Sequence, residues 1–146
     1  MSVADAVTTG RVLGLDLGDR RIGVAVCDQD RTVATPVGTV DRVGDRTIEH
    51  SRIAELCSEH ETTQVVVGLP LSMSGEVGPA ARKVLKEAKA LRKRLGCEVL
   101  THDERLTTVT AQASLHQQGV GTKKGRRVVD QVAASVILQS WMDSSR

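Results

Sequence analysis

The stretch RVLGLDLGDRRIGVAVCD, residues 11–28, decides the fold class of this chain. It contains two runs rich in Val, Leu and Ile, separated by the polar residues Asp19 and Arg20, and this pattern predicts a hairpin of two well-buried β-strands. A third strand over residues 32–40 would extend the hairpin into an antiparallel meander. Pro36 places that strand at the edge of the sheet, because proline cannot donate a hydrogen bond to a neighbouring strand.

The remaining sequence alternates strand and helix patterns. A short apolar run followed by a helix is typical of a strand that joins a parallel sheet through a helical crossover. A basic, glycine-rich stretch over residues 119–127 has no apolar period and is expected to be a mobile loop. We therefore predict an α/β fold with a five-stranded mixed sheet, three strands in an antiparallel meander and two parallel, flanked by helices. The elements expected after the meander are a helix capped by Asp45 and ending near Glu61, a strand over 64–68, a helix over 79–95, a strand over 97–104, and helices over 108–118 and 128–142.

The length of 146 residues suits one domain. Residues 1–10 are small and polar and are expected to form a flexible tail, with a single domain over residues 11–143. No apolar run approaches the ~18 residues that span a bilayer, and the first residues lack the pattern of a signal peptide, so we expect a cytoplasmic protein without membrane contact. Three widely spaced cysteines without a C-x-x-C pair argue against disulfides and against a zinc site.

The charge pattern is compatible with a polyanionic partner. Residues 82–127 carry 12 basic and 4 acidic side chains, whereas residues 1–81 carry 7 basic and 12 acidic ones. Such a basic block is either the solvated face of a helix or the footprint of a nucleic acid. With one Trp and no Phe or Tyr in the chain, bases cannot be stacked on aromatic platforms. Any nucleic-acid partner would therefore be held through its phosphates.

Asp16 is a carboxylate inside an otherwise apolar strand. Alternation along the strand places the leucines on one face and Asp16 on the other. An unpaired buried charge is costly, so Asp16 requires a partner or a special position. It could form a salt bridge with Arg20 or Arg21, it could begin the turn, or it could bind a cation such as Mg²⁺, which prefers carboxylate oxygens.

Three further acids are candidates for the same site. Asp103 and Glu104 close a predicted strand and point to opposite faces, so only one of them can share a face with a ligand on a neighbouring strand. Asp130 is expected in the first turn of the last helix, where the helix dipole favours an anion even without a function. Two strand ends and one helix start are a plausible way to gather carboxylates around one or two metal ions.

Four motifs in order and spacing resemble the YqgF family, whose members are described as Holliday junction resolvases or pre-ribosomal-RNA nucleases. The likeness covers about residues 10–143, and four motifs in sequence are more specific than the first alone. The motifs are DLGDRRIGVAV over 16–26, VVGLPLSMSG over 66–75, DERLTT over 103–108 and VDQVAASVILQSW over 129–141.

The resemblance implies an RNase H-like fold and a nuclease that cuts phosphodiester bonds with a divalent metal ion, Mg²⁺ or Mn²⁺. Carried over position by position, it implies that Asp16, Glu104 and Asp130 are the catalytic acids and metal ligands, with Asp103 open as an alternative to Glu104. The substrate is either a structured RNA such as a ribosomal RNA precursor or a branched DNA. The protein is expected to be a monomer or a weak homodimer.

Several other residues are candidates for substrate binding. Gly68 and Pro70 follow a buried strand and precede a helix, a position where ligands bind in many α/β sheets. The cations of the expected loop over 119–127 could close on a phosphate beside the acids. The full set of candidates is Arg20, Arg21, Gly68, Pro70, Arg105, Lys123, Lys124, Arg126 and Arg127.

Other functions compete with the nuclease. The four histidines, Ser72 and Ser74 show no triad or H-x-x-x-H spacing, and we expect them to be ordinary surface or loop residues. The first motif also resembles the phosphate-binding turn of the actin-like ATPases, which need two lobes where this chain has length for one. A non-catalytic RNase H-like module that binds RNA or protein, in transcription or ribosome assembly, is the main alternative.

Overall fold

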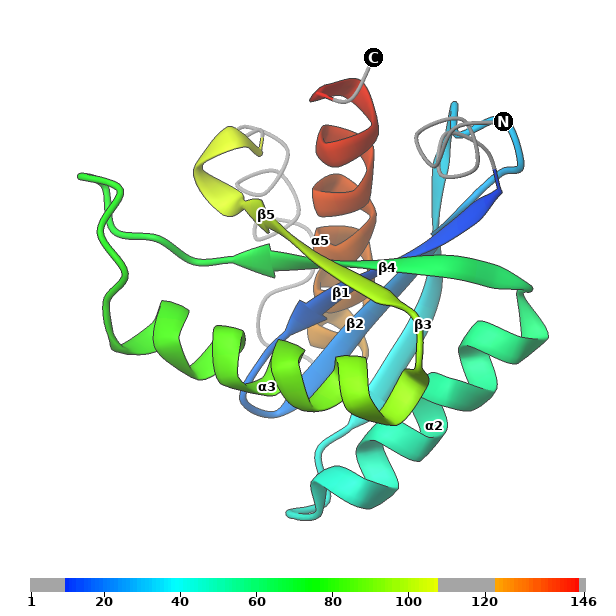
Figure 1. The fold of residues 1–146 in the computed structure, drawn as a ribbon, viewed down its shortest axis with the longest axis horizontal. Coiled ribbons are helices and arrows are strands. Elements are labelled where there is room, and N and C mark those ends of the chain that lie inside the picture. The colour runs from blue at the N-terminus through cyan, green and yellow to red at the C-terminus, as the bar shows by residue number, and fades with distance from the viewer. Residues whose placement is uncertain (1–9, 108–122, 145–146) are drawn as a thin grey trace.

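The computed structural model describes residues 10–107 and 123–144, which form a mixed sheet with helices on both faces (Figure 1). The strands are β1 (Arg11–Leu17), β2 (Arg21–Cys27), β3 (Ala34–Asp41), β4 (Thr62–Leu69) and β5 (Glu98–Asp103). The helices are α2 (Arg46–Glu59), α3 (Pro79–Leu95), the 3₁₀ helix η1 (Glu104–Leu106) and α5 (Lys123–Ser144).

The strand order is β3-β2-β1-β4-β5, with β1 in the centre. The first three strands run antiparallel to one another, and β4 and β5 run parallel to β1. This is the predicted five-stranded mixed sheet. The meander strand β3 lies at the edge, and its Pro36 pairs with Ala25 beside a shift in register, as expected for a residue that cannot donate to the ladder.

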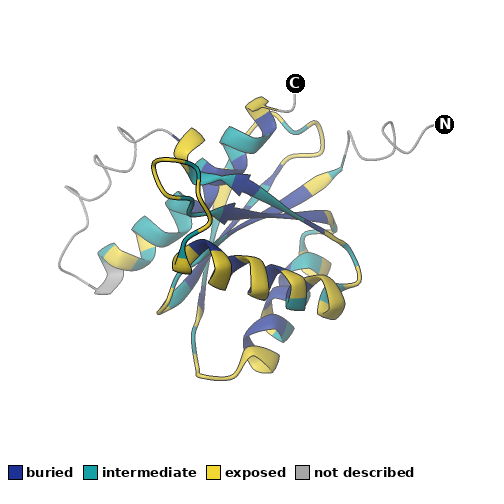
Figure 2. Cartoon of the chain, turned by 60° about the vertical axis from the view of Figure 1, so that its left-hand side comes forward, coloured by how far each residue is buried: buried dark blue, intermediate teal, exposed yellow. Residues whose placement is uncertain are grey.

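Alternation along β1 divides the core into two layers. Leu13 and Leu15 are fully buried on the side of the sheet that α2 and α3 cover. Val12 is fully buried on the opposite side, against the apolar residues of α5 such as Leu138. Figure 2 shows the buried strands between the helices, with the exposed sides of α2 and α3 turned outward and α5 mostly of intermediate exposure. Both faces of the central strand are therefore packed, and the position of any side chain on it is well defined.

Local capping explains where two of the helices begin and end. Asp45 accepts hydrogen bonds from the backbone N–H groups of Thr47 and Ile48 and so caps the N-terminus of α2. Pro79 stands at the start of α3, where its missing N–H costs nothing, and Gly96 ends that helix in the left-handed conformation at φ 66°. These helix boundaries agree with the sequence prediction to within two residues.

The start of the last helix was predicted incorrectly. α5 begins at Lys123 instead of Val128, so residues 123–127 form its first turns and are not part of a mobile loop. Lys and Arg are good helix formers, and the single Gly125 does not outweigh them. The rest of that loop, residues 119–122, and the helix expected over 108–118 lie outside the described residues.

None of the helices in the described part of the chain combines the length and apolar character needed to cross a bilayer.

Candidate active site

Asp16 lies near the end of β1 on the face covered by α5. It pairs across the hairpin with Gly23, and a Cβ atom on Gly23 would stand 2.0 Å from the backbone oxygen of Asp130 in α5. Paired residues of antiparallel strands point to the same side, so the Asp16 side chain is directed toward α5. Gly23 is required here because α5 approaches the sheet too closely for a side chain.

Glu104 lies on the same face of the sheet as Asp16, but it comes from the edge strand β5. It is the first residue of η1, directly after β5. Its side chain lies over Gly68 near the end of β4, where an added Cβ atom would be 2.7 Å from Glu104 Oε1. Because β4 lies between β1 and β5, the absence of a side chain at Gly68 lets Glu104 extend across β4 toward Asp16.

Asp130 projects from α5 and is held by Arg21 at the start of β2. The Arg21 Nε atom donates to Asp130 Oδ2 at 2.7 Å. Asp130 stands about two turns inside α5, not in its first turn as predicted. The helix dipole acts mainly at the terminal turn and does not explain an acid at this position. The acid is stabilised by a specific cation instead.

The electrostatic environment links the three acids. Burial, together with the nearby charges of Glu104 and Asp130, raises the pKa of Asp16 from 3.8 to about 7. The pKa of Glu104 is also raised, first by burial and then by the charge of Asp103. Asp16 is thus the most perturbed carboxylate of the group, and both other candidate acids lie close enough to contribute.

The carboxylates of Asp16 and Glu104 have oxygen atoms available to a ligand. Neither accepts a hydrogen bond from another side chain or backbone group within residues 10–107 and 125–144. No side-chain polar atom in these ranges is both fully enclosed and unpartnered, so the two carboxylates remain accessible. Clustered carboxylates with raised pKa values and accessible oxygens have the chemistry of a site for a hard cation.

The donor set fits a hard divalent cation. Mg²⁺ and Mn²⁺ prefer carboxylate oxygens and complete their coordination with water. Across the same described ranges, no three Asp, Glu, His or Cys side chains already surround a single ion position. Asp130 forms an ion pair with Arg21, so the carboxylates of Asp16 and Glu104 are the two that could bind a cation without first losing a partner among these residues.

Asp103 is committed to a different role. The Nε and Nη2 atoms of Arg105 donate to both Asp103 carboxylate oxygens over 2.7–3.1 Å, and the Arg105 backbone N–H donates to Oδ1 at 2.9 Å. The hydrogen bond from the Arg105 side chain is the main reason that the pKa of Asp103 is lowered. The geometry therefore favours Glu104 over Asp103 as the open acid of the DERLTT motif.

Arg105 also ties the loop after β4 to the site. Its Nη1 atom donates to the backbone oxygen of Met73 at 3.2 Å, and its guanidinium lies against Gly75. Because Arg105 also donates to both carboxylate oxygens of Asp103, it holds residues 70–78 beside the end of β5. Pro70, half-buried, lies at the start of this loop.

The other predicted substrate cations are distributed unevenly. Arg20 is exposed in the turn between β1 and β2. Arg127 donates to both carboxylate oxygens of Asp41 at 2.9 and 3.1 Å, so it anchors α5 to the end of β3. Arg126 is exposed on α5. Lys123 and Lys124 belong to the first turn of α5, and their side chains lie outside the described residues.

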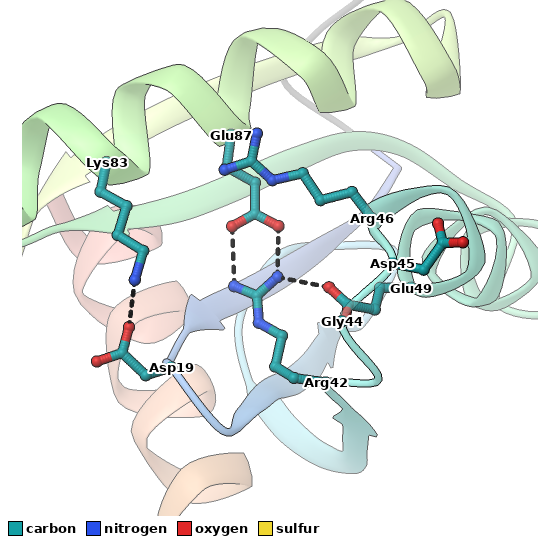
Figure 3. Close-up of a pocket in the computed structure, with 8 residues that line it drawn as sticks. All are labelled: Asp19, Arg42, Gly44, Asp45, Arg46, Glu49, Lys83 and Glu87. Atoms are coloured by element: carbon teal, nitrogen blue, oxygen red, sulfur yellow. Dashed lines mark hydrogen bonds and ion pairs between the residues drawn. The ribbon is translucent and has the colours of Figure 1, made fainter.

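A polar network on the opposite face of the sheet was not anticipated. Arg42 bridges Glu87 of α3, at 2.6 and 2.8 Å, and Glu49 of α2, at 2.9 Å (Figure 3). His50 Nε2 also hydrogen-bonds Glu87 at 2.8 Å, so His50 is buried and not a surface residue as predicted. His102 is likewise buried, beside Ser140.

In the sequence, this network is indicated by polar residues within the apolar stripes of helices α2 and α3. Glu87 stands between Val84 and Ala88 on the buried side of α3. The network borders a pocket of about 330 Å³ whose lining includes three basic and four acidic side chains, so the charges largely balance. The charged groups of the network form hydrogen bonds with one another, and we assign the network a structural role.

The geometry of the acids can now be compared with known proteins. Residues 10–144 match the family model described as RuvX: Holliday junction resolvase. The chain belongs to the RuvX family. This is the YqgF family that its motifs resemble, and it is a family of nucleases. None of the three candidate acids lies outside the matched region.

Relatives of high identity support the same membership. A protein of Streptomyces coelicolor is 49% identical over 138 residues, covering 94% of this chain and 82% of its own. A protein of Mycobacterium tuberculosis is 48% identical over 136 residues, covering 92% of this chain and 79% of its own. Both relatives are named as pre-16S rRNA nucleases.

Solved structures support the RNase H-like fold. RuvC of Thermus thermophilus, in complex with a Holliday junction substrate, aligns with a TM-score of 0.58 at 14% identity, covering 93% of this chain and 96% of that one. At this identity the likeness concerns the fold alone. Nucleases of the RuvX and RuvC type generally depend on a divalent metal ion.

Proposed function

We propose that this RuvX-family protein is a metal-dependent endonuclease that hydrolyses phosphodiester bonds in precursor small-subunit ribosomal RNA. The two relatives named as pre-16S rRNA nucleases support this substrate, since each is nearly half identical over more than nine-tenths of the chain. The observation that carries the reaction is Asp16, an accessible carboxylate whose pKa is raised to about 7 by burial and two neighbouring acids. Precursor ribosomal RNA is processed where it is made, and we place the protein in the cytoplasm.

Asp16, Glu104 and Asp130 are proposed to hold Mg²⁺ or Mn²⁺. The bound metal would supply an activated water and stabilise the charge that develops on the leaving oxygen. Asp16 is fixed by packing on both faces of β1, and Gly68 makes room for Glu104. These two side chains provide the ready donors, and Asp130 joins them when its contact with Arg21 is exchanged.

The cations around the acids are proposed to position the substrate. Arg21 stands beside Asp130, so its guanidinium can pass from that carboxylate to a phosphate without leaving the site. Arg20 is exposed on the same turn. Arg105 would affect substrate binding indirectly, because its hydrogen bonds to Asp103 and to the backbone oxygen of Met73 hold the loop over 70–78 beside the acids. Each contact would be made through phosphate, in keeping with the lack of Phe and Tyr.

The family description makes four-way junction DNA the second candidate substrate. A junction has two-fold symmetry and favours a dimeric enzyme, whereas a monomer can trim an RNA. The oligomeric state in the presence of each substrate therefore bears on the choice. We favour the RNA and a monomer or weak homodimer.

A cleavage panel tests the proposal. Precursor 16S rRNA fragments, four-way junction DNA and duplex DNA would be incubated with Mg²⁺, Mn²⁺ or EDTA. We expect metal-dependent cleavage of the RNA, lost in Asp16→Asn and Glu104→Gln while RNA binding persists. Asp19→Asn is the matched control, because Asp19 is an exposed acid of the same hairpin that faces Lys83 instead of the site.

Each outcome has a definite meaning. Preferred cleavage of the junction would assign the enzyme to DNA. Binding without cleavage of any substrate would support the non-catalytic module. Normal cleavage by Asp16→Asn would remove the acid site from the reaction.

A further inference from the structure

Helix α3 carries a straight line of basic side chains along its exposed side. Arg82, Lys86, Lys89 and Lys93 are spaced four, three and four residues apart, which places them one above another on a helix. All four are exposed. Figure 2 shows the outer side of α3 open to solvent along its length. We call these four residues the α3 stripe.

The stripe differs from the basic residues that flank it. Lys83 pairs with Asp19 at 2.7 Å, and Arg92 Nε donates to the backbone oxygen of Val99 at 2.9 Å. Arg94 Nη2 donates to Ser51 Oγ at 3.1 Å. By contrast, no side chain of the stripe has a hydrogen bond or ion pair with any part of the chain that the structure describes. The flanking cations serve the fold, and the stripe does not.

Helix stability accounts for only one member of the stripe, Lys93, which lies in the last turn, where the helix dipole favours a cation. Like charges three and four residues apart repel one another on a helix. Arg82 lies in the first turn, where the helix dipole disfavours a cation, and this turn contains no acid. The only acid of α3, Glu87, is buried and bound to Arg42 and His50, so it does not offset the exposed charge.

The neighbouring helix α2 shows the usual arrangement for a solvated surface. Its Arg52 pairs with Glu55 at 2.9 Å and with Glu59 at 3.2 Å. These pairs neutralise the exposed side of α2 internally. The uncompensated charge of α3 is therefore a local feature of one helix and not a general property of this face of the protein.

We propose that the α3 stripe binds nucleic-acid phosphates as a second contact, separate from the acid site. This inference rests on the proposed function, because it concerns the same substrate. α3 has 17 residues and is about 25 Å long, enough to follow several consecutive phosphates. It begins at Pro79, after the loop that Arg105 holds beside the acids, and runs back toward the start of β5 (Figure 1).

The placement determines what kind of substrate can use both contacts. α3 lies on the face of the sheet opposite α5, so a nucleic acid must bend around or extend past the edge of the sheet to reach it from the acids. A short fragment around the cleaved bond would contact the acids alone. The stripe therefore selects long, structured substrates over short ones.

The test compares Lys86→Gln/Lys89→Gln/Lys93→Gln with the wild type. Glutamine retains helix propensity, so the exposed variant should fold. Affinity for an RNA hairpin with a long duplex arm would be measured by fluorescence anisotropy in EDTA over a range of salt concentrations. Each lost phosphate contact lowers the slope of log K against log salt by about 0.9, so we expect a decrease of up to about 2.7. Cleavage of the long hairpin should show a raised KM with unchanged kcat, and cleavage of a short fragment should not change.

The matched control is Arg11→Gln/Arg46→Gln/Arg52→Gln. It removes the same charge from exposed positions outside α3. We expect its salt slope to change by less than about one contact. Labelling of amines in the wild type gives an independent readout, since bound RNA should slow the modification of Lys86, Lys89 and Lys93.

The results separate this inference from the proposed function. If the wild type cleaves the hairpin, but the stripe variant keeps the full salt slope and bound RNA does not protect Lys86, Lys89 and Lys93 of the wild type from labelling, the stripe is not a nucleic-acid contact. If the variant loses affinity for polyglutamate but not for RNA, the stripe binds an acidic protein and the inference is wrong. If the wild type binds no nucleic acid, the proposed function and the inference fail together.

Discussion

Arg21 and Asp130, 109 residues apart in the sequence, are joined by a hydrogen bond of 2.7 Å between Nε and Oδ2. The side chains are 14% and 29% exposed, so the pair is shielded from solvent more than most surface ion pairs. It connects the hairpin that carries Asp16 to the helix that covers it. The same contact keeps one of the three candidate acids occupied.

Replacing Arg21 with Gln should weaken the fold and free Asp130. A charge-assisted hydrogen bond contributes about 1.5–3 kcal/mol, so we expect a loss of that order in the free energy of unfolding without metal. Mg²⁺ should then raise the melting temperature of Arg21→Gln more than that of the wild type, because Asp130 no longer has a competing cation. Thermal unfolding with Mg²⁺ or EDTA measures both effects.

Lys83→Gln is the control for the loss of a cation. Lys83 and Asp19 are 63% and 85% exposed, and such pairs contribute little because solvent and salt screen them. This variant should unfold at the wild-type temperature and respond normally to Mg²⁺. An equal response to Mg²⁺ in all three proteins would mean that Asp130 takes no part in metal binding.

Gly68→Ala should damage activity more than stability. The added Cβ atom would stand 2.7 Å from Glu104 Oε1 and 2.6 Å from Ile137 Cδ1, so both side chains must shift. Overpacking of this kind costs about 1–3 kcal/mol. A displaced catalytic group can lower the rate by about 100-fold, and we expect a loss of that order in kcat on the RNA substrate.

Gly38→Ala provides the comparison for Gly68→Ala. Gly38 lies in the edge strand β3, and an added Cβ atom would meet nothing within 4 Å. Its cleavage rate should equal that of the wild type. If Gly68→Ala cleaves at the same rate as Gly38→Ala, the position of Glu104 over β4 is not important for the reaction.

The sheet could be predicted because its signals are local. Alternating apolar runs mark β1 and β2, Pro36 marks the edge strand, and Pro79 and Gly96 bound α3. The start of α5 was missed because its first residues are basic and glycine-containing and have no apolar period. Helix propensity continued the helix where the hydrophobic pattern did not.

The candidate site was only partly predictable. Asp16 was identified because a lone acid in an apolar strand needs a physical reason. The closeness of Glu104 to Gly68, and of Arg21 to Asp130, depends on how distant segments pack, and no spacing along the chain encodes it. The sequence predicts a surface position for His50 because its buried partner, Glu87, lies in another helix.

Glu87→Gln should reveal the contribution of the network on the other face. Burial alone would raise the pKa of Glu87, but hydrogen bonds from Arg42 and His50 lower it to about 2 from 4.5. A lowered pKa means that the stabilisation is complete above pH 4.5 and is lost as the pH falls toward 2. The shift corresponds to about 3 kcal/mol, so the variant should be less stable at pH 7 and lose less stability on acidification.

Urea unfolding at several pH values measures this difference. Glu55→Gln is the control, because Glu55 is exposed and pairs only with Arg52 of the same helix among the described residues. It should unfold as the wild type does at every pH. A Glu87→Gln variant with wild-type stability at pH 7 would contradict a stabilising role for the network.

Asp16→Asn should make the metal-free protein more stable at alkaline pH. The pKa of Asp16 is raised from 3.8 to about 7, first by burial and then by Glu104 and Asp130. The folded protein therefore retains this proton between pH 3.8 and 7, and its stability falls as the pH rises through that range. Above pH 7 the ionised carboxylate costs about 4 kcal/mol, which asparagine removes.

The measurement is urea unfolding of both proteins in EDTA at pH 4 and pH 8, repeated at pH 8 with Mg²⁺. The two should be nearly equal at pH 4, where Asp16 is largely protonated in the folded state. At pH 8 the variant should be more stable, and Mg²⁺ should close the gap by stabilising only the protein that has the carboxylate. If Asp16→Asn is instead less stable than the wild type at pH 8 in EDTA, Asp16 is a structural ion-pair residue. The metal site built on it would then be wrong, because a carboxylate that stabilises the metal-free fold already has its partner within the chain.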